Sequence, residues 1–572
     1  MFLGSRSRLR TAVIAAVVGA GVLTAATPAS AAPAAAGNRS YLVITAPGAT
    51  AGAASAVSGN GGVVWTSYDA IGVIVAHSTA TDFATKMRTV SGVQKVGATR
   101  TSDVPAEAAN PPLPANPSQV TPATGEPLRS DMTQIGADKA WAKNLGSPDV
   151  TVGVLDTGVD DQHADLKPNF DAADSASCAY GKLDTRVGSW RDTDTHGTHV
   201  AGTIAAAKNG SGMVGVAPGV KIASVRIAEK PSGLFYAENT ICAMVFSGDR
   251  GFAVTNNSYY SDPWLFNCPD NADQDAILEG VKRAVAYAEG KGVLNVAAAG
   301  NENYNLANKT RDTSSPNDST PVQRTVTNAC LSVPTEVSGV VSVASITSGN
   351  GKSSFSNYGT DKIHLAAPGD SVYSTVPGGR YGSKSGTSMA SPHVAGVAAL
   401  LKSTNPAATP AQLKALLATQ ADDLACTDSR CSGTTAKNNF FGEGRVDALA
   451  AVEGTQPPGR TFENTTDVAI PDNGPAVTSP ITVSGITGNA PATLKVDVDI
   501  VHTYRGDLVV DLVAPDGTVY SLQRSSGDSA DNIVATYTVN ASSEVANGTW
   551  KLQVKDVAAR DTGSINSWKL TF

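Results

Sequence analysis

Short apolar runs alternate with amphipathic stretches in the N-terminal part of the chain. Between residues 39 and 101 they predict strands at 41–44, 63–68, 71–76 and 93–96, with helices at 48–57 and 82–89. The order strand–helix–strand–strand–helix–strand is that of a ferredoxin-like fold. We therefore expect a small α+β domain at 39–101.

A second region, 126–454, carries near-continuous apolar or β-branched runs separated by helical stretches. The runs lie at 150–155, 221–227, 251–256, 293–298 and 340–346, and the helices at 196–207, 236–250 and 275–289. Strands that are apolar throughout are buried on both faces, so the pattern predicts an α/β fold with a mostly parallel sheet flanked by helices. In such sheets the functional groups gather where the strands end. Asp156 and Asn301 follow two of the predicted strands.

Alternation of apolar and polar residues dominates after a turn-rich break at 455–460, which we interpret as a linker. The runs at 494–500, 508–513 and 550–554 have this pattern, and turn sequences separate them. The region 461–572 is therefore predicted to be an all-β sandwich.

The length and charge of the chain narrow the class of protein. A chain of 572 residues is too long for one compact core, so several domains are expected. Its 41% hydrophobic and 16% charged residues are typical of globular protein, and its 55 glycines fit many tight turns. A net charge of −8 argues against a general nucleic-acid-binding protein, so we expect no nucleic acid partner.

The first 31 residues have the pattern of a secretory signal peptide. Arginines at positions 6, 8 and 10 precede an apolar run at 11–23, and Ala29-Ser30-Ala31 offers a small-residue cleavage site. A membrane anchor is the alternative, but it needs about 20 apolar residues and this run is shorter. We therefore expect a secreted, extracellular protein with no membrane association once the signal is removed.

All six cysteines lie in the region 126–454, and an even number in an exported chain predicts three disulfides. Cys426 and Cys431 are close in sequence across a polar turn and are expected to pair. The other four cysteines allow three connectivities, of which we favour the pairs Cys268–Cys330 and Cys178–Cys242. No Cys-x-x-Cys spacing occurs, which argues against a zinc or redox site.

Three glycine-flanked motifs carry the groups of a nucleophilic hydrolase. Asp156 lies in the sequence VLDTGVD, His196 in DTHGTHV and Ser388 in GTSMASPHVAG. A carboxylate and an imidazole are what an enzyme needs to activate a hydroxyl, which is a weak nucleophile by itself. Together the three motifs resemble those of the subtilisin-like serine proteases, and the chain order Asp–His–Ser is the one found in subtilisin.

The resemblance implies a role for each of these residues. His196 takes the proton of the Ser388 hydroxyl as that oxygen attacks a peptide carbonyl, and Asp156 orients the imidazole. Asn301, in the sequence AAAGNE, is similar to the asparagine that forms the oxyanion hole with the backbone N–H of the nucleophile. Ser388 stands where an apolar helix begins, and we expect Pro392 in the first turn of that helix.

The resemblance also implies where a substrate binds. One edge of the cleft is expected at 256–260 and includes Ser258, Tyr259 and Tyr260, the last of which replaces a glycine that is usual in the family. The floor of the pocket, with Ala299 and Gly300, is small and apolar, which favours an apolar or aromatic substrate side chain. No acidic pattern of the kind that selects paired basic residues follows this floor.

Three oxygen-bearing side chains, those of Asp165, Asn209 and Glu126, are similar to side chains that help to bind a stabilising calcium ion in relatives. Carboxylate and amide oxygens from loops suit Ca²⁺. The alternative is that these loop residues are merely solvated. No cofactor is required for the chemistry itself.

The two flanking regions also resemble parts of known protease precursors. Region 39–101 stands where subtilisin-like enzymes have their inhibitory propeptide, with an independent small domain as the alternative. Residues 102–125 are rich in proline, alanine and asparagine, as suits an exposed linker that is cut during processing. Region 461–572, with the sequences APDGT and GTW, is similar to the P domain, a jelly roll that follows the catalytic domain in proprotein convertases.

These inferences predict a secreted serine endopeptidase that is made as a self-processing zymogen and acts on polypeptides. Its own propeptide is the expected intramolecular inhibitor, and the protein is expected to be a monomer. An α/β-hydrolase esterase would need a Gly-x-Ser-x-Gly motif and the order Ser–Asp–His, and neither is present around Ser388. A silent binding scaffold would normally have lost a triad or oxyanion residue, and all four are present.

Overall fold

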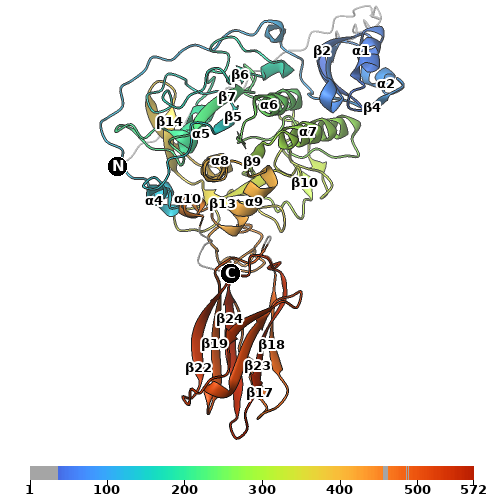
Figure 1. Ribbon diagram of the computed structural model, residues 1–572. Helices are drawn as coiled ribbons and strands as arrows, with labels where there is room; N and C mark the ends of the chain where they lie inside the picture. Colours follow the sequence, from blue (N-terminus) through green and yellow to red (C-terminus); the bar gives the residue numbers. More distant parts are fainter. Residues whose placement is uncertain (1–36, 455–460, 485, 487–488) are drawn as a thin grey trace, which may run out of the picture. The chain divides into compact units, whose positions relative to one another are not determined.

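The computed structural model describes residues 37–454, 461–484, 486 and 489–572. The predicted signal peptide at 1–31 and the predicted linker at 455–460 lie outside these residues. Within the described ranges, no helix combines the length and the apolar character needed to cross a membrane. The elements follow one another along the chain in the order that the sequence predicts for an α+β, an α/β and an all-β region (Figure 1).

The N-terminal region has the predicted ferredoxin-like order. Its elements are β1 (Arg39–Thr45), α1 (Thr50–Gly59), β2 (Gly62–Tyr68), β3 (Val73–Ser78), α2 (Phe83–Met87) and β4 (Val93–Ala98). The four strands form an antiparallel sheet in the order β2-β3-β1-β4.

The second region is built on a seven-stranded sheet in which all neighbouring strands are parallel, as predicted. From edge to edge its strands are β13 (Leu365–Pro368), β12 (Val341–Ile346), β9 (Leu294–Ala298), β8 (Val254–Asn257), β5 (Thr151–Asp156), β7 (Lys221–Arg226) and β6 (Ala176–Ser177). Its helices are α3 (Ser130–Gln134), α4 (Ala137–Ala140), α5 (His196–Ala205), α6 (Ala237–Arg250), α7 (Ala272–Gly290), α8 (Thr387–Thr404), α9 (Pro410–Thr419) and α10 (Ala448–Glu453). Two antiparallel hairpins pair β10 (Arg311–Asp312) with β11 (Arg324–Thr325) and β14 (Val372–Val376) with β15 (Arg380–Lys384).

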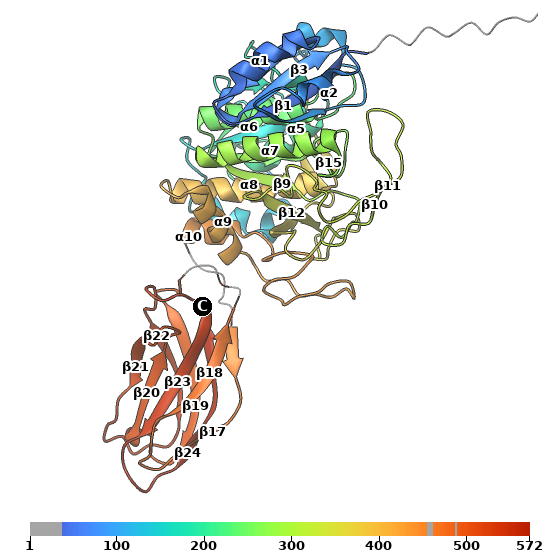
Figure 2. The ribbon, with the colours of Figure 1, turned by 90° about the vertical axis from the view of Figure 1, so that its right-hand side faces the viewer.

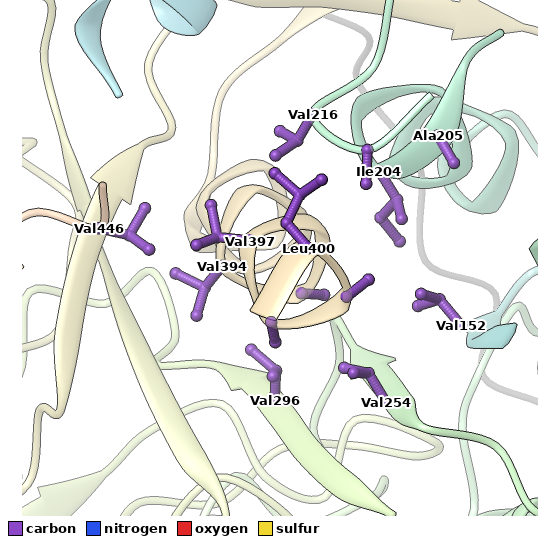
Figure 3. Packing of buried hydrophobic residues seen from close by; sticks show 14 of the residues in the cluster. Val152, Ile204, Ala205, Val216, Val254, Val296, Val394, Val397, Leu400 and Val446 are labelled. Carbon is purple, nitrogen blue, oxygen red and sulfur yellow. The ribbon is translucent and has the colours of Figure 1, made fainter. Parts of the chain in front are cut away.

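Alternate residues of each strand supply the cores on the two faces of this sheet. Val152 and Val154 of β5 lie in a cluster with residues of α5 and α8, whereas Leu155 lies in a cluster with residues of α6 and α7. Helices therefore cover both faces, and α6 and α7 run side by side (Figure 2). Figure 3 shows that α8 is itself enclosed, because its apolar side chains meet Val254 and Val296 of the sheet. Because α8 is packed on the sheet, its first turn, which includes Ser388, has a fixed position relative to the sheet.

The N-terminal sheet uses its two faces differently. Val43 and Ile74 point toward α1 and α2 and form a core within that region. Leu42, Ile44 and Val75 point the other way and share a cluster with α6 and α7. One face of the small sheet is therefore covered by the second region and not by its own helices.

The C-terminal region is the predicted all-β sandwich. Its strands are β16 (Thr461–Asn464), β17 (Val468–Ile470), β18 (Val477–Val483), β19 (Leu494–His502), β20 (Leu508–Val513), β21 (Val519–Gln523), β22 (Ile533–Val539), β23 (Gly548–Asp556) and β24 (Gly563–Thr571). One antiparallel sheet has the order β16-β24-β19-β22 with β17 beside β24, and the other has the order β18-β23-β20-β21. Trp550 and Trp568 are fully buried in the core of this region.

Candidate active site

Asp156 and His196 form a hydrogen-bonded pair at one end of the parallel sheet. Asp156 is the last residue of β5, and His196 begins α5. The Oδ1 atom of Asp156 accepts hydrogen bonds from His196 Nδ1 (2.7 Å) and from the backbone N–H of Thr157 (2.7 Å). The Asp156 side chain is fully buried, whereas 25% of the His196 side chain is exposed. A carboxylate can only accept, so Nδ1 carries the proton and Nε2 is left to act as a base.

Two glycines allow the acid and imidazole segments to meet. Gly158 has a φ angle of 110°, a conformation that favours glycine. Its carbonyl oxygen lies where a Cβ atom on Gly197 would collide with it. The backbone N–H of Gly197 also donates to the Thr157 hydroxyl (2.8 Å). The residues after Asp156 and His196 in their motifs therefore serve the close packing of β5 against α5.

The surroundings of His196 raise the pKa of its imidazole. Burial by itself lowers this pKa, but the charge of Asp156 and the hydrogen bond to it raise the pKa by more. Lys384 lowers the pKa and Asp192 raises it, and both act less strongly than Asp156. The pKa of His196 therefore lies above its ordinary value of 6.5.

Ser388 is the second residue of α8 and is joined to Ser258 by two hydrogen bonds. Its hydroxyl donates to the carbonyl of Ser258 (3.2 Å), and the Ser258 hydroxyl donates to the carbonyl of Ser388 (3.0 Å). Because α8 begins at Thr387, Pro392 lies in the second turn, and its expected place in the first turn is wrong. Proline has no N–H to donate to the carbonyl four residues earlier, so the Ser388 carbonyl is available to Ser258.

Asn301 follows β9 and is held by the residue before Ser388. Its Oδ1 atom accepts hydrogen bonds from the backbone N–H (2.8 Å) and the hydroxyl (3.0 Å) of Thr387. The Thr387 hydroxyl in turn accepts from the backbone N–H of Gly300 (3.0 Å). With Oδ1 engaged in this way, the Nδ2 amide of the exposed Asn301 side chain is the group that can donate to a bound molecule.

Ser388 and Asn301 line one cavity of about 290 Å³. Four of the predicted substrate-contacting residues line it as well: Ser258, Tyr259, Tyr260 and Gly300. His196 borders a neighbouring hollow that shares Ser258, Gly233 and Phe235 with this cavity. The structure therefore brings the imidazole, the hydroxyl and the amide around the same short segment.

Ala299 is a predicted substrate-contacting residue that does not line this cavity. Its side chain packs with Ala344 and Ile346 in a hydrophobic cluster, and Ala298 lines the cavity instead. Successive side chains of a strand point to opposite sides, so only one of these two neighbouring alanines can face the cavity.

Besides the small residues of the expected floor, two carboxyl groups, those of Asp262 and Glu302, line the cavity. Asp262 accepts hydrogen bonds from the backbone N–H of Phe235 (2.5 Å) and from Asn317 Nδ2 (2.7 Å). The same amide donates to the Tyr260 hydroxyl (3.0 Å). Burial raises the pKa of Asp262 to about 7. Asp262 was not predicted from the sequence, although its place two residues after Tyr260 was a usable signal.

The three residues expected to bind calcium lie together. Asn209 Nδ2 donates to Asp165 Oδ1 (3.2 Å), and Glu126 Oε1 accepts from the backbone N–H of Asn209 (2.6 Å). Asp165 Oδ2 accepts from the backbone N–H of Met213 (2.9 Å). In the part of the chain that the structure describes, no group of three or more His, Cys, Asp or Glu side chains is arranged to hold a metal. The set offers two carboxylates and one amide, and these oxygens are of the kind that calcium prefers.

Three disulfides are present in the described structure, and they are the pairs that the sequence analysis favoured. They join Cys178 to Cys242, Cys268 to Cys330 and Cys426 to Cys431. The first ties the segment after β6 to α6, next to the loops that border the site.

Comparison with known proteins matches residues 147–444 to the Subtilase family and residues 491–572 to the proprotein convertase P-domain. The Extracellular basic protease of Dichelobacter nodosus is 32% identical over 504 residues, which cover 77% of this chain and 75% of that protein. Subtilisin DY of Bacillus licheniformis is 31% identical over 319 residues, or 56% of this chain and 96% of that protein.

Other similarities cover less of the relative or show only the fold. Leupeptin-inactivating enzyme 1 of Streptomyces exfoliatus is 64% identical over 154 residues, which are 26% of this chain and 35% of that enzyme. The chain thus spans about a third of that relative's length (35%). The crystal structure of the epidermin leader peptide processing serine protease of Staphylococcus aureus has a TM-score of 0.58 at 21% identity, covering 73% of this chain and 98% of that one.

Proposed function

Because the chain belongs to the subtilase family, we propose that it is a secreted serine endopeptidase that cleaves peptide bonds through Asp156, His196 and Ser388. The observation that carries this proposal is the buried Asp156–His196 hydrogen bond beside a cavity lined by Ser388 and Asn301. A similar protease described as extracellular supports secretion, and so do three disulfides, which persist in oxidising surroundings.

In the proposed reaction His196 carries two protons in turn, the first from Ser388 to the departing amine and the second from water back to the Ser388 oxygen. The Ser388 hydroxyl leaves its hydrogen bond to Ser258 and donates to His196 Nε2, and its oxygen attacks the substrate carbonyl as the proton moves. Asp156 stabilises the imidazolium that forms. His196 then gives the proton to the departing amine, which leaves an acyl ester on Ser388. A water molecule, deprotonated by the same imidazole, hydrolyses this ester and restores the serine.

A fluorophosphonate will test the nucleophile and the base together. It will label Ser388, because the serine oxygen bonds to phosphorus as fluoride leaves and His196 takes the hydroxyl proton. Asp156 holds the pKa of His196 above 6.5, so the base is neutral above that pKa and protonated below it. The labelling rate will therefore fall as the pH is lowered through a value above 6.5. Mass spectrometry locates the label, and rates across the neutral range give the pH profile. A label on another serine, or a fall centred below 6.5, would contradict these assignments.

Asn301→Ala will lower kcat by about 10²–10³, the range known from subtilisin, with a small change in KM. Negative charge grows on the substrate oxygen in the transition state, where Asn301 Nδ2, the backbone N–H of Ser388 and the positive end of α8 can stabilise it. Steady-state kinetics on a peptide substrate measures the effect. Asn308→Ala removes an exposed amide of the same loop and serves as the control. An unchanged kcat in Asn301→Ala would exclude the amide from the oxyanion site.

The N-terminal region is proposed to assist folding and to block the site until it is cut away at 102–125. Supporting this role, the face of its sheet formed by Leu42, Ile44 and Val75 is covered by α6 and α7. An independent domain would expose these apolar side chains to water. One face of the sheet packs on α1 and α2 and the other on α6 and α7. This packing favours a propeptide over a domain with a separate function.

A Ca²⁺ ion held by Asp165, Asn209 and Glu126 is proposed to stabilise the second region, 126–454, which we call the catalytic region from here on. Chelation by EGTA will lower the Tm, by about 2–4 °C for each kcal/mol of lost stabilisation, and added calcium will restore it. Scanning calorimetry measures the shift. In Asp165→Asn the difference between EGTA and calcium will nearly vanish, whereas Asp149→Asn, at an exposed site, will keep it. Equal Tm values with and without EGTA in the unmodified protein would contradict the site.

A further inference from the structure

Arg100 places a charged side chain inside the catalytic region. It lies just beyond β4, and only 3% of its surface is exposed. Its guanidinium donates to both oxygens of Glu229 (2.7 and 2.9 Å) and to Oε1 of Glu238 (2.5 Å). It also lies over the ring of Tyr236, 3.7 Å from the ring centroid. We call the pocket formed by Glu229, Tyr236 and Glu238 the acidic recess.

The acidic recess belongs wholly to the catalytic region and suits a guanidinium. Glu229 lies in the segment after β7, Tyr236 precedes α6, and Glu238 stands in the first turn of α6. Both glutamates are almost fully buried, with 2% and 0% exposure. Two parallel hydrogen bonds to one carboxylate and a flat aromatic face match the planar, forked group of arginine, and a lysine ammonium cannot use either feature in the same way.

The acidic recess adjoins the catalytic cleft. Glu229 borders the same hollow as His196 and Ser258. The chain beyond Arg100 is held by Asp318, which accepts the backbone N–H groups of residues 101 (2.8 Å) and 102 (2.9 Å). Asn317, the neighbour of Asp318, lines the cavity of Ser388. Arg100 thus enters the recess from the segment after β4, and this segment runs close to the site of the proposed chemistry.

Removal of the N-terminal region leaves the acidic recess without its cation. In the described structure, the ion pairs of Glu229 and Glu238 are with Arg100. Arg226, a nearby buried cation, donates instead to the carbonyls of Ser189 and Ala228. Two buried carboxylates that face one another are unfavourable unless a cation pairs with them or they bind protons. The processed protein therefore presents a doubly acidic pocket next to its cleft.

We propose that the acidic recess is a specificity subsite that binds an arginine side chain of the substrate, N-terminal to the bond that is cut. This rests on the proposed endopeptidase function. The position of this arginine, N-terminal to the bond that is cut, is inferred from Arg100, because the proposed processing region at 102–125 lies C-terminal to Arg100. In the precursor Arg100 occupies the subsite, and in the processed enzyme an arginine of the substrate takes its place.

Peptides with one arginine test the proposal on the processed enzyme. In a set of otherwise neutral peptides, arginine is moved through successive positions, and each peptide is paired with one that carries citrulline, which has nearly the same shape but no charge. Mass spectrometry locates each cut. The cut will keep a constant distance on the C-terminal side of arginine, and kcat/KM will be at least about tenfold higher for arginine than for citrulline.

Charge-removing variants complete the test. Glu229→Gln and Glu238→Gln will each reduce the arginine preference while cleavage of citrulline peptides continues. Glu463→Gln, an exposed glutamate of β16, will keep the preference. If the unmodified enzyme cuts arginine and citrulline peptides equally, or if the cut does not follow arginine, the subsite is overturned and the endopeptidase function stands. If it cuts none of the peptides and no protein substrate, the proposed function fails first.

Discussion

Ser388→Ala will slow peptide hydrolysis by about 10⁶-fold, the scale of loss seen when subtilisin loses its triad serine. The hydroxyl is the proposed attacking group, and alanine offers no oxygen in its place. Asp156 and His196 will keep their hydrogen bond, so the Tm will change little relative to the unmodified chain in the same processing state. Peptide hydrolysis by the purified protein and a thermal melt measure the two quantities.

The same variant will accumulate as an uncut precursor. If processing is carried out by the chain itself, a protein without its nucleophile cannot remove residues 39–101. Expression in a protease-free background, followed by gel analysis and N-terminal sequencing, shows whether the cut occurs. Ser383→Ala removes an exposed hydroxyl of β15 and will mature normally. Maturation of Ser388→Ala would contradict self-processing, and near-normal hydrolysis by it would contradict the nucleophile.

Asp156→Asn will lower kcat by about 10⁴ with a much smaller change in KM. In the structure Asp156 Oδ1 accepts from both His196 Nδ1 and the backbone N–H of Thr157. An amide of the same shape can turn an N–H₂ group toward His196, which favours the tautomer with its proton on Nε2. The imidazole then cannot take the proton of Ser388.

Steady-state kinetics at several pH values measures this effect. Loss of the Asp156 charge removes the interaction that raises the pKa of His196, so residual activity will persist to lower pH than in the unmodified enzyme. Asp149→Asn removes an exposed charge shortly before β5 and will keep both kcat and the pH profile. A kcat for Asp156→Asn within tenfold of normal would show that this carboxylate does not orient the base.

The fold follows closely from the spacing of apolar residues. The run at 150–155 became β5 at Thr151–Asp156, and the helix expected at 236–250 became α6 at Ala237–Arg250. These elements are recognisable because each is buried over most of its length. Two elements, β13 and α9, were not predicted from the sequence. β13 has only four residues and ends in proline, and α9 buries few of its side chains, so neither has a strong periodic signal.

Some residues of the candidate site could likewise be predicted from the sequence, and others could not. The triad motifs, Asn301 and Ser258 could be located because their local sequences are distinctive. Asp262 was not assigned although it lies two residues after Tyr260, and the sequence does not tell which of the neighbouring Ala298 and Ala299 lines the cavity. The expected preference for an apolar substrate side chain was drawn from one wall of the pocket and stays a prediction, while the structure adds Asp262 and Glu302 to the lining.

The amino-acid order by itself determined which groups are available for chemistry and where the strongly patterned strands and helices lie, because these depend on neighbours within a few residues. Only the tertiary structure decided which charges are buried and which are paired. Arg100 is separated from Glu229 by 129 residues, and nothing near either residue indicates that they meet. Burial depends on the whole surrounding surface, so the electrostatic character of the recess and of the cavity exists only once the distant segments have packed together.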